Sequence, residues 1–485
     1  MRLRLTLMGL ALASSAALAA DPELAELRQQ VQQLKRDYEQ KIRALEARVS
    51  RAEAAAVQAQ TTRGNAVADQ TVPTAQSPLD KALAETSAMA SEQEPSTTTR
   101  TTPAPFSGTS IGPFSLIDVS FNILGVGGWS TAPDSIIEEL EGGAHDPKRR
   151  GFTLQQGELG LAGVVDPYFN AQAYIVFTDE SVELEEAYLT TTSLPWDLQA
   201  KAGYFFTEFG RNNPTHPHSW AWIDQPFINT RLLGGEGNRA AGTRLSWLLP
   251  TRWYSEIYLG AQNANNETEV SFLGEREGTE GGIGGLTATK DDVDNLTDLL
   301  YLARWANSWD LNPEWSTQIG LSALHGPNLT GNRGETWIYG TDLVAKWRPS
   351  NSYRGWPFLI WETEIMARDY DIDTANPAFD PASMDKSLKD WGLYTQALYG
   401  FTPRWAAGLR FEYASGSGNG LEAREDDPFR ADRFRFSPLL AFYPSEFSRI
   451  RLQYNYDHAD NLTEDEHSVW VGFEVSYGAH PAHKY

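Results

Sequence analysis

The chain contains no cysteine in its 485 residues, which excludes disulfides, thiolate metal sites, cysteine nucleophiles and a lipid-modified N-terminal cysteine. It also lacks any run of about twenty consecutive apolar residues, so no transmembrane helix is expected. Basic residues are in deficit, since 40 Lys and Arg stand against 64 Asp and Glu, a formal charge of −24. Phosphate binding needs a basic surface, and nucleic acid is therefore excluded as a partner.

The first residues have the pattern of an export signal. Arg2 and Arg4 precede an apolar stretch that ends in a small-residue cleavage site at 17–19. Residues 1–20 are therefore predicted to be a signal peptide that is removed when the protein is exported.

The next two segments differ sharply in composition. Residues 21–56 carry apolar positions at steps of three and four with one extra step of four, which predicts an α-helical coiled coil with a stutter. A lone amphipathic helix is the alternative. These apolar positions are Leu24, Leu27, Val31, Leu34, Tyr38, Ile42, Leu45, Val49, Ala52 and Ala56. Residues 57–111 are mainly Ala, Thr, Ser, Gln and Pro and are predicted to be a disordered linker.

From residue 112 onward, segments of about ten to fourteen residues alternate apolar with polar positions, as strands with two different faces do. In the segment 448–457, for example, Ile450 and Leu452 alternate with Arg451 and Gln453. The predicted strands are 114–127, 152–164, 168–178, 182–192, 198–209, 240–249, 253–263, 297–307, 314–325, 337–347, 357–368, 388–399, 404–415, 433–443, 448–457 and 467–477.

The connections between these segments alternate in length. Short turns, mostly with proline as at Asp166-Pro167 and Thr402-Pro403, alternate with longer acidic or glycine-rich stretches such as 210–239. Outer-membrane barrels sort their turns and loops in this way, and backbone groups in hydrocarbon require the sheet to close. The sequence therefore predicts an all-β fold. Residues 112–485 are expected to form a closed antiparallel transmembrane barrel of about 16 strands, with the coiled coil in the periplasm.

Charged residues fall on the inward face of the predicted barrel and in the long stretch 210–239. Two interpretations stay open: they line a pathway for polar solutes, or they pair with one another and fill the lumen. If Tyr443-Pro444-Ser445 is the turn, Arg451 faces Leu439. The predicted lumen and constriction residues are Arg211, Asp224, Glu236, Arg244, Glu362, Glu364, Arg410, Glu412, Arg433, Arg435 and Arg451.

In this architecture the chain resembles the porins, in particular sixteen-stranded trimeric porins that carry an N-terminal coiled coil. The resemblance implies passive diffusion of small polar or charged solutes through a homotrimer set in outer-membrane lipid and lipopolysaccharide. It also implies that the third external loop, 210–239, folds inward as a constriction. The loop's own aromatic residues Trp220, Trp222 and Phe227 are expected to pack it against the wall.

The segment from Phe205 to Pro250 also resembles predicted outer-membrane proteins linked to zinc supply. His216 and His218 with Asp224 or Glu236 would suit Zn²⁺ as a bound or transported ion. His480 and His483 make a second candidate pair. The alternative is that these histidines are ordinary loop residues and that the protein has no cofactor.

Other classes of function are weighed against the channel. Ser219 next to His218 lacks a Gly-x-Ser-x-Gly elbow, so no enzyme is expected. A structural barrel tethered through residues 21–110 is a third hypothesis. The acidic loops favour cations and the arginines favour anions, and the sequence leaves that choice open.

Overall fold

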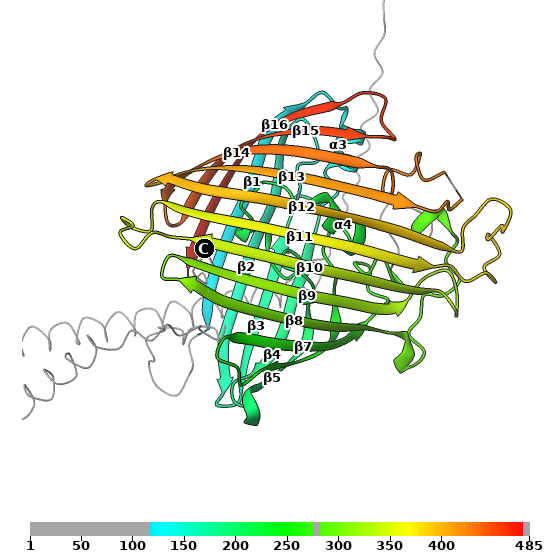
Figure 1. The fold of residues 1–485 in the computed structure, drawn as a ribbon, viewed down its shortest axis with the longest axis horizontal. Coiled ribbons are helices and arrows are strands. Elements are labelled where there is room, and N and C mark those ends of the chain that lie inside the picture. The colour runs from blue at the N-terminus through cyan, green and yellow to red at the C-terminus, as the bar shows by residue number, and fades with distance from the viewer. Residues whose placement is uncertain (1–116, 275–281, 422, 479–485) are drawn as a thin grey trace, which may run out of the picture. The chain divides into compact units, whose positions relative to one another are not determined.

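A computed structural model describes residues 117–274, 282–421 and 423–478, and these residues form sixteen β-strands and two α-helices (Figure 1). The predicted signal peptide, coiled coil and linker, and both His480 and His483, lie outside the described residues. The strands are β1 (Asp118–Ser130), β2 (Gly151–Asp166), β3 (Phe169–Phe177), β4 (Val182–Thr191), β5 (Leu198–Phe206), β6 (Arg239–Leu248), β7 (Tyr254–Asn263), β8 (Leu299–Asn312), β9 (Trp315–Pro327), β10 (Glu335–Trp347), β11 (Phe358–Asp371), β12 (Ser387–Thr402), β13 (Trp405–Ser417), β14 (Arg433–Ser445), β15 (Ser448–Ala459) and β16 (Glu466–Gly478).

Each strand pairs antiparallel with its neighbours in sequence, and β1 pairs with β16 to close the ring. The closing pair runs from Ser120 opposite Gly478 to Ser130 opposite Ser468. Closure leaves no strand edge unpaired, as a sheet in hydrocarbon requires. The predicted closed barrel of sixteen strands is confirmed, and each predicted strand coincides with an observed one to within a few residues at its ends.

The connections sort into two ends of the barrel, as the sequence indicates. Short turns such as 167–168, 403–404 and 446–447 lie at one end, and the loops 131–150, 207–238 and 264–298 lie at the other. The two α-helices, α3 (Asp134–Leu140) and α4 (Phe227–Leu233), belong to loops 131–150 and 207–238. No helix within the described residues is long and apolar enough to cross a membrane.

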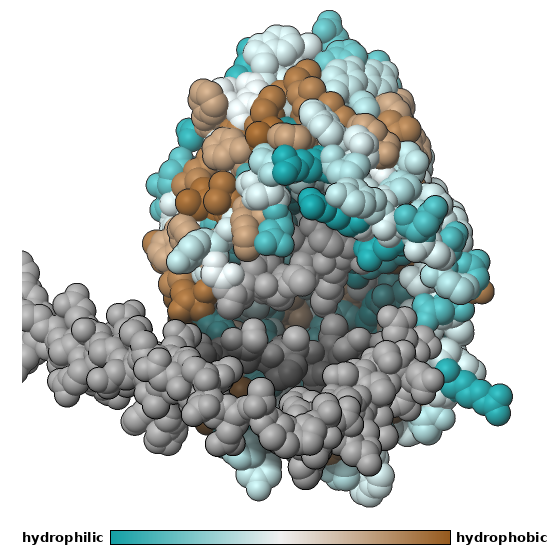
Figure 2. Space-filling view, turned by 90° about the vertical axis from the view of Figure 1, so that its left-hand side faces the viewer, coloured by the Kyte–Doolittle hydropathy of each residue, from teal (hydrophilic) through white to brown (hydrophobic). Residues whose placement is uncertain are grey.

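The outer face of the wall is apolar. Outward side chains in the middle of β15 and β16, among them Leu452, Val471 and Phe473, are 45–47% exposed, whereas the side chains between them are buried. Figure 2 shows apolar residues gathered along one outer flank of the barrel. Exposed aromatic residues lie towards both ends of the strands, as in the girdles of transmembrane barrels. They include Trp129, Phe152, Trp337 and Trp391 at the loop end and Tyr168, Trp196, Trp253 and Phe447 at the turn end.

Candidate functional site: the loop inside the barrel

Loop 207–238 crosses the interior of the barrel. Its first residues bind one side of the wall, because the backbone amide of Gly210 donates to Ser322 Oγ of β9 (3.1 Å). Its middle binds another side, where Trp222 Nε1 donates to the carbonyl of Ser437 on β14 (3.0 Å). The amide of Phe227, at the start of α4, donates to Glu412 of β13 (2.7 Å). The loop therefore lies inside the ring where the porin resemblance placed it (Figure 1).

Apolar side chains fix the loop as well. Phe227, Ile228, Leu232 and Leu233 of α4 are buried in one cluster with inward residues of β8, β9 and β11. Trp222 is buried in a second cluster with residues of β11 to β14. Burying a large apolar side chain stabilises by roughly 1.5–3 kcal/mol, so this packing holds the loop independently of its polar contacts. The expected wall packing of Trp222 and Phe227 is observed, while Trp220 is only half-buried.

Asp224 is the polar centre of the loop. Its side chain is buried and accepts hydrogen bonds from Arg410, from Arg435 (2.7 Å), from Gln453 (2.7 Å) and from Asn455 (3.0 Å). Burial alone would raise the pKa of Asp224, but Arg410 and Arg435 lower it well below its usual value. The carboxylate is therefore charged, and it links the loop to three strands.

The arginines predicted to line the lumen are themselves paired. Arg410 Nε lies 2.7 Å from Glu412 Oε1, and Arg435 binds Glu141 (2.9 Å) as well as Asp224. Arg433 and Arg435 both bind Asp457 of β15 (2.6 and 2.8 Å). These arginines are at most 5% exposed. The interpretation in which the charges pair and fill the lumen therefore describes this side of the barrel.

Arg451 takes part through main-chain atoms of the loop. Its guanidinium donates to the carbonyl oxygen atoms of Trp220 (3.2 Å) and Trp222 (2.7 Å). The expected register was wrong here: Arg451 lies opposite Ala441, not Leu439. The reason is that Ser445 pairs with Ser448, so the turn is 446–447 and not Tyr443-Pro444-Ser445.

The other predicted residues form smaller groups. Arg211 lies 3.4 Å from Glu362 on β11, and its backbone amide donates to Glu364 (3.0 Å). Arg244 and Lys201 both bind Glu208 (2.8 Å each). Burial alone would raise the pKa of Glu208, but Lys201 and Arg244 lower it to about 2.

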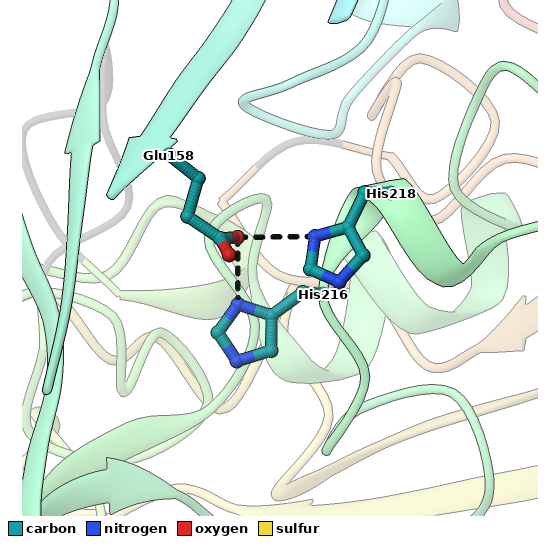
Figure 3. A group of neighbouring side chains, drawn as sticks. All are labelled: Glu158, His216 and His218. Carbon is teal, nitrogen blue, oxygen red and sulfur yellow. Dashed lines mark hydrogen bonds and ion pairs between the residues drawn. The ribbon is translucent and has the colours of Figure 1, made fainter. Parts of the chain in front are cut away.

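The histidines of the loop meet carboxylates from strands, not from the loop itself. Nδ1 of His216 and Nδ1 of His218 lie 3.1 and 3.2 Å from the same oxygen, Oε2 of Glu158 on β2 (Figure 3). His216 also lies 2.8 Å from Glu185 and 2.9 Å from Glu186 of β4. Burial alone would lower the pKa of His216, but Glu185 and Glu158 outweigh it and raise the pKa well above its usual value.

The carboxylates beside these histidines are not the expected Asp224 or Glu236. Asp224 binds arginines instead, and Glu236 binds Arg239 (3.0 Å) at the border of the histidine group. Glu185 and Glu186 were missed because adjacent strand residues normally point to opposite faces. A β-bulge inserts Glu185, since Tyr174 pairs with Glu186 and Ile175 with Leu184, and so both glutamates point inward and are buried.

Ser219 is not arranged as a nucleophile. Its hydroxyl donates to the carbonyl oxygen of His216 (2.7 Å), and Nδ1 of His218 faces Glu158. A serine nucleophile instead needs its hydroxyl directed at a base. The expectation that the protein is not an enzyme remains a prediction.

One sequence relative decides the family. An uncharacterized protein of Aquifex aeolicus (strain VF5) is 30% identical over 412 residues, which cover 79% of this chain and 82% of that protein. The chain belongs to the family of this Aquifex protein. No family model matches the chain.

Solved structures similar to this chain include outer-membrane porins and channels. The outer membrane channel DcaP of Acinetobacter baumannii has a TM-score of 0.49 and 12% identity, covering 76% of this chain and 99% of that one. An anion-selective porin from Comamonas acidovorans has a TM-score of 0.45 and 10% identity, and the match covers 75% of this chain and 100% of that one. The resemblance to zinc-linked proteins remains a prediction.

Proposed function

We propose that the protein is a porin-like channel of the outer membrane of a Gram-negative bacterium, through which small polar or charged solutes diffuse. One observation supports this most strongly: a closed barrel with an apolar outer face encloses a polar interior that loop 207–238 crosses without burying every inward side chain. A sixteen-strand barrel is wide enough for an aqueous passage. The loop is its constriction.

The passage follows the wall of β3 to β5. Inward side chains of β13 to β15 are buried beneath the loop, whereas Gln172, Tyr174, Tyr188 and Lys201 remain half-buried. These side chains offer hydroxyl, amide and ammonium groups to a solute. An ion pair between the loop and β11 also borders the proposed passage. It joins Arg211 to Glu362, whose side chains are 24% and 18% exposed.

The passage should prefer cations. The arginines of β13 to β15 are paired with buried carboxylates and covered by the loop, so they attract anions weakly. Exposed acidic residues such as Asp291, Asp292 and Glu425 remain at the loop end of a chain of charge −24. Rings and patches of one sign set the selectivity of pores, and here the acidic field prevails.

We expect stable conductance steps in planar bilayers and a reversal potential of cation-selective sign in a KCl gradient. Lys201→Glu removes the ammonium group from the passage and should shift the reversal potential further toward cations. The matched control is Lys389→Glu, because Lys389 is 61% exposed on the outer face of β12. An anion-selective wild type would contradict the expected preference for cations, and equal shifts in both variants would contradict the path along β3 to β5.

The proposal includes a homotrimer in contact with outer-membrane lipid and lipopolysaccharide. The tethering hypothesis concerns residues 21–110, which lie outside the described residues. Conductance that persists after their deletion would favour the channel over the tether.

A further inference from the structure

A second group of ionisable side chains lies where loop 207–238 faces β2 and β4, away from Asp224. Within a few ångströms it contains the imidazoles of His216 and His218 and the carboxylates of Glu158, Glu185 and Glu186. All five side chains are 13% exposed or less. Carboxylates are seldom buried in such number without a matching positive charge.

His145, from loop 131–150, adds a third imidazole at the edge of this group. It is 6% exposed, and its Nδ1 lies 3.2 Å from the carbonyl oxygen of Gln155. A carbonyl only accepts, so Nδ1 of His145 carries a hydrogen and donates it to Gln155. Nε2 of the same ring has no hydrogen-bond partner within the described residues and lies 4.0 Å from Glu185 and 3.8 Å from Glu236.

Arg239 lies 3.8 Å from Glu185 and 3.0 Å from Glu236 and balances part of their negative charge, but Nε2 of His145 has no hydrogen-bond partner among the described residues. Histidines that bind metal usually donate their other ring N–H to a backbone carbonyl, as His145 does to Gln155. This observation is independent of the contacts of His216 and His218, and it also points to a cation.

Two irregularities of the wall build this group. The bulge at Glu185 turns that carboxylate inward beside Glu186. A second bulge, in β2, makes Gln155 the extra residue, because Leu124 pairs with Gln156 and Gly125 with Leu154. Bulges are common beside functional sites, where they redirect a side chain.

We propose that Glu158, His216 and His218 bind a divalent transition-metal ion such as Zn²⁺. The ligand atoms of Glu158, His216 and His218 all lie within 4.8 Å of one another. Tetrahedral Zn²⁺ with ligands at about 2.0–2.1 Å needs ligand atoms about 3.3 Å apart. The contacts of 3.1 and 3.2 Å that Glu158 makes with the two histidines therefore need to open by only a few tenths of an ångström.

The mixed nitrogen and oxygen ligands select the kind of ion. Ca²⁺ and Mg²⁺ prefer sites made of oxygen alone, whereas imidazole with carboxylate suits zinc and its neighbours. A bound ion would fasten the loop to β2 and β4, on the side that Asp224 does not hold. The site goes beyond the proposed channel, because metal can bind whether or not the barrel conducts.

The test uses the purified, folded full chain, stripped of metal with EDTA and titrated with ZnCl₂ by calorimetry. We expect one zinc ion per chain, and a loss of affinity of at least about tenfold in His218→Ala and in Glu158→Gln. Two double variants serve as controls. His458→Ala with His467→Ala changes histidines of β15 and β16 outside the group, and His480→Ala with His483→Ala removes the second candidate pair from the sequence. Both should bind zinc as the wild type does.

No zinc binding by the wild type, or unchanged affinity in both His218→Ala and Glu158→Gln, would overturn the proposal. Loss of binding in the 480 and 483 variant would overturn it too, because it would place the ion elsewhere. If the two ligand variants fail to fold, the visible spectrum of the wild type with CoCl₂ is the deciding measurement. Intense bands would indicate a Co²⁺ ion with four nitrogen and oxygen ligands. Weak bands typical of six-coordinate Co²⁺ would contradict the site. Conductance is measured separately, so an absent metal site and an absent channel are distinguishable.

Discussion

Asp224→Ala should release the middle of loop 207–238 and raise the conductance of the channel. The substitution leaves the buried guanidinium groups of Arg410 and Arg435 without their shared carboxylate. Removing one partner of a buried ion pair costs about 3–5 kcal/mol where the remaining charge is left unpaired. The cost here should be smaller, because Arg410 keeps Glu412 and Arg435 keeps Glu141 and Asp457. Single-channel recording should show larger and noisier steps, and trypsin should cut within the loop, at Arg211 or Arg231, faster than in the wild type.

The matched control is Glu236→Ala. Glu236 belongs to the same loop, but 28% of its side chain is exposed and it binds Arg239 near the loop's end. Its removal should leave the cleavage rate near that of the wild type. Equal cleavage of wild type and Asp224→Ala would show that the apolar packing of Trp222 and α4 alone holds the loop.

Acid should not reproduce this effect. The pKa of Asp224 is lowered in the folded protein, so its contribution to stability is present above the unfolded value of about 3.9 and disappears only as the pH falls through the lower folded value. The wild type at pH 5 should therefore keep a protected loop. Opening at pH 5 would contradict an ionised, arginine-bound Asp224.

Leu452→Arg should impair folding into a bilayer. Leu452 lies in the middle of β15, pairs with Val471 of β16 and is 46% exposed on the outer face. An arginine on the lipid face at the bilayer midplane costs about 2–4 kcal/mol, and the cost falls to about 0–1 kcal/mol near the interface. Urea titration of the protein folded into liposomes measures the difference in free energy of unfolding.

Val182→Arg is the control for depth. Val182 is the first residue of β4 and is 67% exposed, so its arginine reaches the aqueous boundary. Its free energy of unfolding should be close to that of the wild type. Equal destabilisation by both variants would argue against a membrane centred on the middle of the strands.

The barrel could be predicted because its constraints are local. Alternating residues such as Ile450 and Arg451 define the two faces of a strand, and proline turns mark one end of the barrel. The interior could not be predicted in the same way. Which carboxylate meets Arg435 depends on how loops 131–150 and 207–238 fold, and Glu141 comes from nearly three hundred residues away.

The histidine group shows the same limit at a finer scale. His216 and His218 could be selected from the sequence, but their partners Glu158, Glu185 and Glu186 could not. A period of two places only one of two adjacent glutamates inside, and the bulge that turns both inward has no clear sequence signal. Buried carboxylates next to each other in a predicted inward strand are the feature to examine in similar barrels.

The most direct test of a passage narrowed by loop 207–238 is swelling of liposomes that contain the purified protein, measured with neutral sugars of increasing size. We expect rapid swelling with a monosaccharide and a steep fall in rate with larger oligosaccharides, because loop 207–238 crosses the interior and narrows the proposed passage. Absence of swelling with the smallest sugar, from protein shown to be folded and inserted, would contradict an open channel.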